Sequence, residues 1–156
     1  GDPWNGWLSY AWSRVTDDEN GIETPRSWDQ THSVGGGVTW SYGAWHATLA
    51  GTYHTGWPTT PVRVVDEPPP ATIEFGPRNS ARFKDYAAVD LRVSRLFVLP
   101  RGDLSLFAEV TNAFDRRNPC CVDFSFGASG DGRLELEREY RHWLPLVPSI
   151  GVLWRY

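Results

Sequence analysis

Six segments of the chain carry apolar or aromatic residues at every second position, which is the side-chain period of a β-strand. The segments are residues 7–14, 30–40, 45–54, 87–97, 103–112 and 148–156. Each is close to the roughly 9–11 residues that cross a bilayer at the usual strand tilt. This pattern limits the fold more than any other feature, because a sheet with one apolar face must cover that face.

The composition agrees with a protein built from strands and turns. The 156 residues include 15 Gly, 12 Pro and 9 Trp, no Met, and Lys84 as the only lysine, so helix formers are scarce. No apolar run approaches the roughly 20 residues of a membrane-spanning helix, and the first ten residues do not resemble a signal peptide. The net charge of −4 and the lack of a basic stripe argue against a nucleic-acid partner.

The connections between the segments alternate between short and long. Residues 41–44 and 98–103 are short connections, whereas residues 15–29, 55–82 and 113–147 are long, polar and rich in Pro and Gly. Outer-membrane barrels alternate in this way, with short periplasmic turns and long extracellular loops. We therefore predict an all-β fold of antiparallel, up-and-down transmembrane β-barrel strands, about six in number, that form an incomplete barrel segment.

This orientation places aromatic residues at the two ends of the strands, where membrane barrels carry aromatic girdles. The residues at the periplasmic level are Trp40, Tyr42, Trp45, Phe97, Trp154 and Tyr156, and those at the opposite rim are Trp12, Tyr53 and Trp57. A soluble β-sandwich explains the alternation equally well. It accounts less well for aromatic residues at strand ends and for long loops on one side only.

The sequence contains none of the short motifs that mark common enzyme sites. G-x-S-x-G is absent, and the run Gly35–Gly37 lies within a predicted strand and precedes no helix, so it does not form a phosphate-binding loop. We expect no enzymatic activity and no cofactor. An outer-membrane hydrolase and a secreted, Trp-rich β-sandwich that binds carbohydrate are the competing classes.

Several stretches resemble the last strands of TonB-dependent outer-membrane receptors. They are RSWDQTHSVGGGVTW (26–40), GTYHTGWPTTP (51–61), DYAAVDLRVSRLF (85–97) and LFAEVTNAFDRRNP (106–119). The final SIGVLWRY resembles the β-signal of outer-membrane barrels, with Ser149, Gly151, Trp154 and Tyr156 in its defined positions. Each motif alone is weak, but together they follow the family's order from about residue 6 to the last residue.

The resemblance implies the outer membrane of a Gram-negative bacterium and TonB-dependent uptake of a scarce solute, foremost a ferric siderophore-type ligand. Members of the family resemble barrels of about 22 strands that enclose a plug domain. Residues 1–156 are therefore expected to be the C-terminal part of such a barrel, without the plug and the earlier strands. The implied partners are outer-membrane lipid, the rest of the barrel and the plug, TonB through the plug region, the barrel-assembly machinery and a small-molecule ligand.

Two groups of candidate site residues follow from the strands and the loops. The lumen-facing candidates are His46, His54, Asp90, Arg92, Glu109 and Arg155. The ligand-binding candidates in the extracellular loops are Trp57, Arg63, Arg78, Arg116, Arg117, Arg133 and Trp143, because outer loops are where a receptor first captures its ligand. A generic polar interior with charge pairs between strands and plain solvated loops are the alternatives.

Neither the histidines nor the cysteines have the spacing of a metal site. His46 and His54 share a strand face but lie about 27 Å apart along it, so we predict no metal. Cys120 and Cys121 are adjacent and are the only cysteines. Two cysteines in an oxidising compartment normally bond, although adjacent cysteines form a strained ring. A vicinal disulfide, two free thiols and bonds to another chain all remain open.

Overall fold

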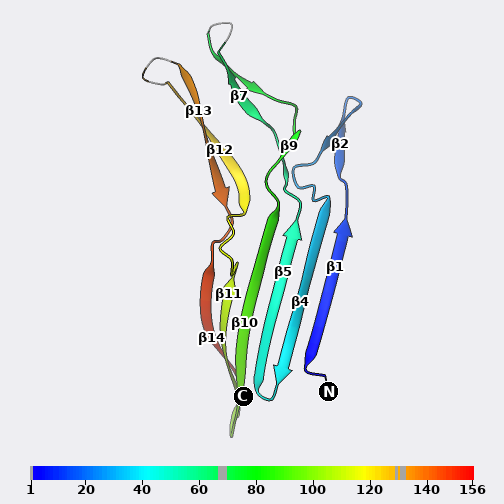
Figure 1. The fold of residues 1–156 in the computed structure, drawn as a ribbon, viewed down its shortest axis with the longest axis vertical. Coiled ribbons are helices and arrows are strands. Elements are labelled where there is room, and N and C mark those ends of the chain that lie inside the picture. The colour runs from blue at the N-terminus through cyan, green and yellow to red at the C-terminus, as the bar shows by residue number, and fades with distance from the viewer. Residues whose placement is uncertain (1, 67–69, 129, 131–132) are drawn as a thin grey trace.

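The computed structural model describes residues 2–66, 70–128, 130 and 133–156, and within these ranges every regular element is a β-strand. Among them, the long strands β1 (Trp4–Trp12), β4 (His32–Tyr42), β5 (Trp45–His54), β10 (Tyr86–Leu99), β11 (Gly102–Thr111) and β14 (Val147–Arg155) form one sheet (Figure 1). Each strand pairs antiparallel with the next in this order. The predicted all-β, antiparallel, up-and-down arrangement of these strands is confirmed.

The segments predicted from the alternation all correspond to strands of this sheet. The segment 45–54 matches β5 at both ends, and the largest difference is at the start of β1, which begins at Trp4 instead of residue 7. The agreement is close because each strand keeps its period-2 pattern from end to end, and that pattern follows directly from the pleat.

The register assigns every residue of the sheet to one of two faces, because directly paired residues share a face. The middle of one face, which we call the apolar face, carries Leu8, Val38, Leu49, Leu91, Val93, Leu106, Ile150 and Val152. All of these side chains are exposed, and Leu8 and Ile150 expose 80% and 87% of their surface. A continuous apolar surface of this size indicates a site of contact with another apolar phase or molecule.

Aromatic residues bound the apolar face at both ends. Near the short turns lie Trp4, Trp40, Tyr42, Trp45, Phe97 and Trp154, and at the other end lie Tyr10, Trp12 and Tyr53. Trp45 and Tyr53 are eight residues apart on β5, which is about 27 Å along the strand. A tilt of about 40° would shorten this to roughly 20 Å, of the same order as the apolar band of an outer-membrane barrel.

Arg95 is the one charged side chain among the apolar-face positions of β10. Its guanidinium carbon lies 5.1 Å from the ring centre of Trp45 and 4.8 Å from that of Phe97. The charge therefore sits within the aromatic row near the short turns, where a long cationic side chain can reach the polar interface of an apolar layer.

The two short turns use residues suited to them. Gly43 precedes Ala44 in the β4–β5 turn and has a φ of +57°, the sign that a type II′ turn requires at its first central position. Gly102 follows Pro100 and Arg101 at the start of β11 with a φ of +118°. A Cβ at Gly102 would also lie 2.1 Å from the carbonyl oxygen of Arg155, so only glycine fits there.

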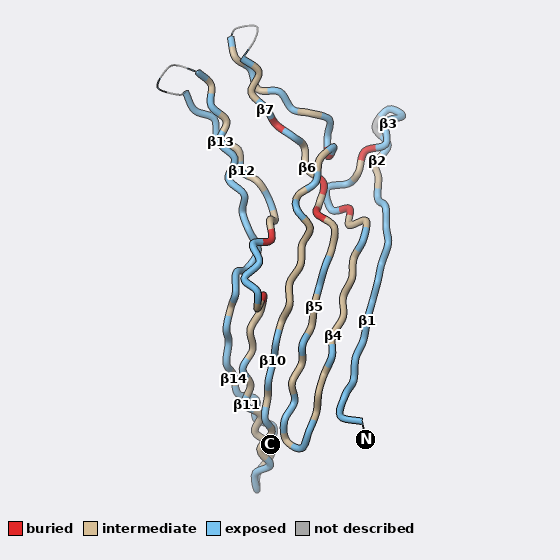
Figure 2. Tube along the Cα trace, viewed as in Figure 1, coloured by how far each residue is buried: buried red, intermediate tan, exposed pale blue. Residues whose placement is uncertain are grey.

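Burial is concentrated at one end of the sheet and not on its faces. The buried residues among those described are Thr24, Asp29, Gly56, Pro58, Val62, Asn79, Asn112 and Asn118. None lies in the six strands of the sheet, and Figure 2 shows them gathered where the long connections join it. Val62 is the only large apolar side chain buried within the described ranges. The sheet itself is thus a single uncovered layer.

The long connections contain two-stranded sheets that the sequence analysis treated as loops. These are β2 (Thr16–Glu19) with β3 (Ile22–Pro25), β6 (Pro58–Thr59) with β9 (Ala81–Arg82), β7 (Val62–Val65) with β8 (Thr72–Phe75), and β12 (Pro119–Ala128) with β13 (Leu134–His142). They extend beyond the end of the sheet (Figure 1). A β-sandwich needs a second sheet over one face, and the described strands do not provide one.

No helix long and apolar enough to cross a membrane occurs in the part of the chain that the structure describes.

Candidate functional site

The long connections meet at the end of the sheet where β1, β5 and β11 finish, and we call this region the rim. It comprises residues 13–31, 55–85 and 112–146, as far as these are described. The Asn20–Gly21 pair forms the tip of the β2–β3 hairpin, with φ values of +57° and +82°. Asn-Gly is the preferred pair for a two-residue hairpin turn with both φ values positive, so the sequence did contain a signal for this hairpin.

The buried carboxylate of Asp29 pairs with the partly exposed guanidinium of Arg82 and ties the first connection to the second. Asp29 exposes only 2% of its surface. Its carboxylate accepts hydrogen bonds from Arg82 Nη2 at 2.5 Å and from the amide of Val15 at 2.8 Å. Arg82 Nη1 also donates to the carbonyl oxygens of Asp29 and Gly56. This guanidinium therefore joins three backbone segments of the rim.

The hydrogen bonds around Asp29 also set its ionisation. Burial disfavours the charged carboxylate, but the hydrogen bond from Arg82, the amide of Val15 and the positive charge of Arg82 together outweigh it and lower the pKa of Asp29. Asp85 is a second such carboxylate: hydrogen bonds from the hydroxyl of Tyr53 and the amide of Gly56 lower its pKa. Both groups hold the rim in their ionised form.

Buried asparagines hold the remaining parts of the rim. Asn118 exposes 1% of its surface and pairs with Ala87 as a strand neighbour would, accepting from its amide at 3.0 Å and donating to its carbonyl at 2.9 Å. Asn112 donates to the carbonyls of Arg116 and Leu144. These side chains satisfy backbone groups that would otherwise be buried without partners.

Asn79 links the second connection back to the first. Its side-chain nitrogen donates to the carbonyl of Pro25 at 2.7 Å and to Ser27 Oγ at 3.3 Å. Its φ of +54° is one that asparagine tolerates better than most residues. The first two connections are therefore fixed to each other by polar contacts.

A cluster of aromatic rings lies at the rim above the end of β5. The ring of Trp57 lies 4.7 Å from that of Trp28, 5.5 Å from that of His54 and 6.0 Å from that of Trp143. His54 stacks in turn on Tyr86 at 4.8 Å. The buried Nε1 of Trp57 has no hydrogen-bond partner among the described residues, so this donor is unsatisfied.

A cavity of about 560 Å³ lies between β6, β7 and β9 on one side and the β12–β13 hairpin on the other; we call it the cationic cavity. Its cationic lining residues are Arg82, Lys84, Arg117 and Arg138, with His142 beside them, and its rings are Phe83, Phe124 and Tyr140. The described lining includes no carboxylate. The charge of Arg82 is paired with Asp29, so Lys84, Arg117 and Arg138 supply the positive charge that, in a chain with a net charge of −4, favours an anionic ligand.

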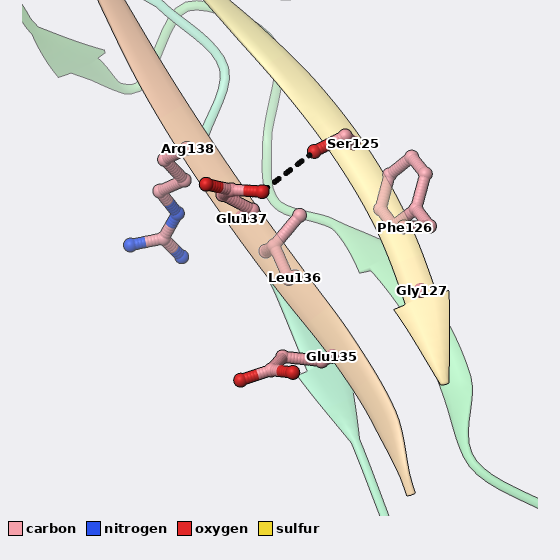
Figure 3. A pocket seen from close by; sticks show the side chains of 7 residues that line it. All are labelled: Ser125, Phe126, Gly127, Glu135, Leu136, Glu137 and Arg138. Atoms are coloured by element: carbon pink, nitrogen blue, oxygen red, sulfur yellow. Dashed lines mark hydrogen bonds between the residues drawn. The ribbon is translucent and has the colours of Figure 1, made fainter. Parts of the chain in front are cut away.

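A second cavity and a groove lie near the cationic cavity and differ from it in the residues that line them. A cavity of about 320 Å³ is lined by Trp28, Trp57, Phe75, Cys120 and Cys121, and it shares Phe83 and Phe124 with the cationic cavity. A groove along β12 and β13 (Figure 3) carries Glu135, Glu137 and Arg138, with Ser125 Oγ donating to Glu137 at 3.4 Å. The groove is exposed and of mixed charge, so the cationic cavity is the stronger candidate for ligand binding.

The structure brings only some of the predicted loop residues together. Trp57 and Trp143 meet in the aromatic cluster, and Arg117 lines the cationic cavity. Arg116 holds the rim, since its Nη2 donates to the carbonyl of Asp85. Arg63 and Arg78 lie outside the cationic cavity. Arg63 pairs with Glu74 at 2.8 Å across β7 and β8, and a side-chain nitrogen of Arg78 lies 3.8 Å from the carboxylate of Asp17. Arg133 immediately precedes β13.

The lumen-facing candidates all lie on the face opposite the apolar face, which we call the polar face. Arg92 Nη1 pairs with Glu109 at 2.8 Å, and its guanidinium lies 3.8 Å from the ring centre of Phe107. Asp90 accepts from the amide of Asn112, and His46 Nδ1 lies 2.9 Å from Ser41 Oγ. Arg155 is exposed on β14. That this face lines a lumen stays a prediction.

Within the predicted β-signal, Ser149, Gly151, Trp154 and Tyr156 lie on or directly after β14. Gly151 pairs with Phe107, and a Cβ there would lie 2.3 Å from Cζ of the Phe107 ring. Gly151 therefore leaves room for the Phe107 ring, over which the Arg92 guanidinium lies. The ring centres of Trp154 and Tyr156 lie 6.4 Å apart. Recognition of these residues by the assembly machinery stays a prediction.

Lys84, Asp29 and the buried asparagines are residues that sequence reasoning did not select. Three of the residues that hold the rim together do lie within stretches already quoted for the resemblance. They are Asp29 in WDQ, Asn112 in EVTN and Asn118 in RRNP. No group of three or more His, Cys, Asp or Glu suited to a metal ion occurs among the described residues.

Comparison of the chain with protein-family models, with curated proteins and with solved structures finds no match.

Proposed function

We propose that this chain is part of an outer-membrane β-barrel of the kind seen in TonB-dependent receptors and that it serves the uptake of a scarce anionic solute. The observation that carries the proposal is the apolar face. It runs in register across the whole sheet, it is uncovered, and aromatic rows bound it at both ends. A lipid-facing barrel wall needs these properties, whereas a soluble sheet would cover the face with protein.

The two edges of the sheet extend the proposal to partners. β1 and β14 each pair with one neighbour within the described chain, and hydrocarbon does not tolerate unpaired strand edges. In the proposed assembly, further barrel strands pair with both edges. The polar face then encloses a plug domain, and TonB acts through that plug.

The rim supports the choice of an anionic solute. In this orientation the hairpins stand on the extracellular side, and the cationic cavity opens between two of them. Ferric siderophore-type chelates present carboxylate, catecholate or hydroxamate oxygens around iron, and such oxygens accept charge-assisted hydrogen bonds from arginine and lysine. The aromatic rings beside the cations supply apolar contact area.

The orientation of the sheet can be tested by thiol labelling in lipid vesicles, with the chain assembled in the proposed barrel so that both sheet edges are paired. In a Cys120→Ser/Cys121→Ser background, the adjacent replacements Val93→Cys and Ser94→Cys put one thiol on each face at the same depth. We expect a water-soluble maleimide to label the Ser94→Cys thiol at least about ten times faster, because lipid shields the apolar face. Equal rates, or faster labelling of the Val93→Cys thiol, would contradict the proposed orientation.

The ligand class can be tested with ferric citrate as the probe. Arg117→Gln removes one cation from the cavity, and we expect about tenfold weaker retention of iron in equilibrium dialysis, the effect of losing one charge-assisted hydrogen bond of about 1.4 kcal/mol. Arg63→Gln is the matched control, because Arg63 pairs with Glu74 outside the cavity. Equal effects of the two variants would argue against the cationic cavity as the binding site.

A further inference from the structure

The two cysteines lie at an irregularity in the β12–β13 hairpin. Pro119 pairs with His142 and Cys121 pairs with Arg141, so Cys120 is an extra residue on β12 without a partner across the ladder. Such a β-bulge interrupts the alternation of side chains and bends the strand. In a regular strand, adjacent side chains point to opposite faces, and two neighbouring thiols could not meet.

Both cysteines line the same cavity at this bulge. Both are free, Cys120 is half-buried and Cys121 is exposed. Burial, followed by a hydrogen bond to Cys121, raises the pKa of the Cys120 thiol. Arg141 lies close enough to interact electrostatically with both cysteines, and its Nε pairs with Asp123 at 2.5 Å. The bulge therefore places a dithiol beside one cavity at the base of the hairpin, with Cys121 exposed.

We propose that Cys120 and Cys121 are a redox-active vicinal dithiol that closes to a disulfide by exchange with an external disulfide. The exposed thiolate of Cys121 attacks the external disulfide, an S–S bond to Cys121 forms, and one external thiolate leaves. The thiolate of Cys120 then attacks Sγ of Cys121, which forms the vicinal bond and releases the second external thiolate. The two protons lost by the cysteines end on the two released thiols, and the external disulfide is the species reduced.

The vicinal disulfide would change the lining of a cavity in the rim. Both cysteines line the cavity of about 320 Å³ that also contains Trp57, and they directly follow Pro119, the first paired residue of β12. A ring between adjacent residues is strained, and strained disulfides are more easily reduced. The pair can therefore change the shape of this cavity reversibly, a property that does not depend on the proposed transport function.

The experiment uses the full chain folded in detergent micelles and exposed to oxidised glutathione, followed by alkylation with iodoacetamide and intact-mass measurement. We expect the main product to have lost two hydrogens and to carry neither glutathione nor an alkyl group. Cys120→Ser and Cys121→Ser should instead stop at a single glutathione adduct. Two alkylated thiols, two stable adducts or covalent dimers in the unmutated chain would overturn the proposal.

A matched control tests the bulge itself. Cys120→Ser/Val122→Cys moves the adjacent thiols to positions 121 and 122, which pair regularly with Arg141 and Tyr140. We expect the vicinal bond to be disfavoured in this variant by roughly tenfold in its equilibrium constant. In urea we expect the two chains to form the vicinal bond with equal equilibrium constants, since unfolding removes the bulge. Equal closure of both pairs in the folded chain would show that the bulge is not responsible.

Discussion

Leu49→Arg is expected to destabilise the proposed barrel, folded in a lipid bilayer with both edges of this sheet paired, by about 2–4 kcal/mol, the effect of an arginine on the lipid face at the bilayer midplane. Leu49 lies four residues from both Trp45 and Tyr53, so it is midway between the aromatic rows. Its paired neighbours, Val38 and Leu91, are apolar. The arginine would find no polar partner there. Urea titration of the vesicle-bound chain, followed by tryptophan fluorescence, measures the difference.

The adjacent Ala50→Arg is the control, because it introduces the same side chain at the same depth on the polar face. Ala50 pairs with Gly37 and Asp90, so the new guanidinium would face water and a carboxylate. We expect a change within about 0.5 kcal/mol, as for an ordinary surface substitution. A similar loss for both variants would refute the assignment of the two faces, and a larger loss for Ala50→Arg would reverse it.

Asp29→Ala is expected to open the rim at a cost of about 3 kcal/mol while leaving the sheet intact. Removing one partner of a buried ion pair costs about 3–5 kcal/mol, and the lower end applies because the Arg82 side chain is 35% exposed. Hydrogen exchange at the amides of Val15 and Arg26 reports the change, since the amide of Val15 donates to the Asp29 carboxylate and that of Arg26 donates to the carbonyl of Val15. Glu74→Ala, which breaks an exposed pair, should cost about 0–1 kcal/mol. Equal exchange in the two variants would contradict the anchoring role.

The same carboxylate gives the rim a dependence on pH. The pKa of Asp29 is lowered in the folded chain, so its contribution to stability is complete above the ordinary carboxylate value of about 3.9. The contribution is lost as the pH falls through the lower folded-state pKa. We expect the protection of rim amides to decrease below about pH 4. Asp29→Asn should reduce this dependence without abolishing it, because the pKa of Asp85 is lowered as well. An unchanged pH profile in Asp29→Asn would exclude Asp29 as its source.

The sheet was predictable because its information is local and periodic. Each strand alternates from end to end, and the Gly43 turn sets the register between β4 and β5. Once the register is fixed, the two faces follow from the pleat alone. That Leu49 and Leu91 share a face could therefore be read from the sequence. Their exposure could not, because alternation is the same whether lipid or a second sheet covers the face.

The rim was less predictable because its contacts join residues far apart in the chain. Arg82 reaches Asp29 across 53 positions, and Arg138 reaches the carbonyl of Val62 across 76. Local propensity carries no signal for such pairs. The Asn20–Gly21 turn is the exception, since its dipeptide marks a hairpin directly. The motif residues Asp29, Asn112 and Asn118 were visible as part of a resemblance, and the structure adds their physical role as anchors.

The polar anchoring of the rim has a consequence for recognition. Loops that are free in solution lose conformational entropy when a ligand orders them, and this weakens binding. Here Asp29, Asn79 and Asn118 already fix the connections that surround the cationic cavity. A ligand would meet a preformed surface, so association should be governed by electrostatic attraction and should slow as ionic strength rises.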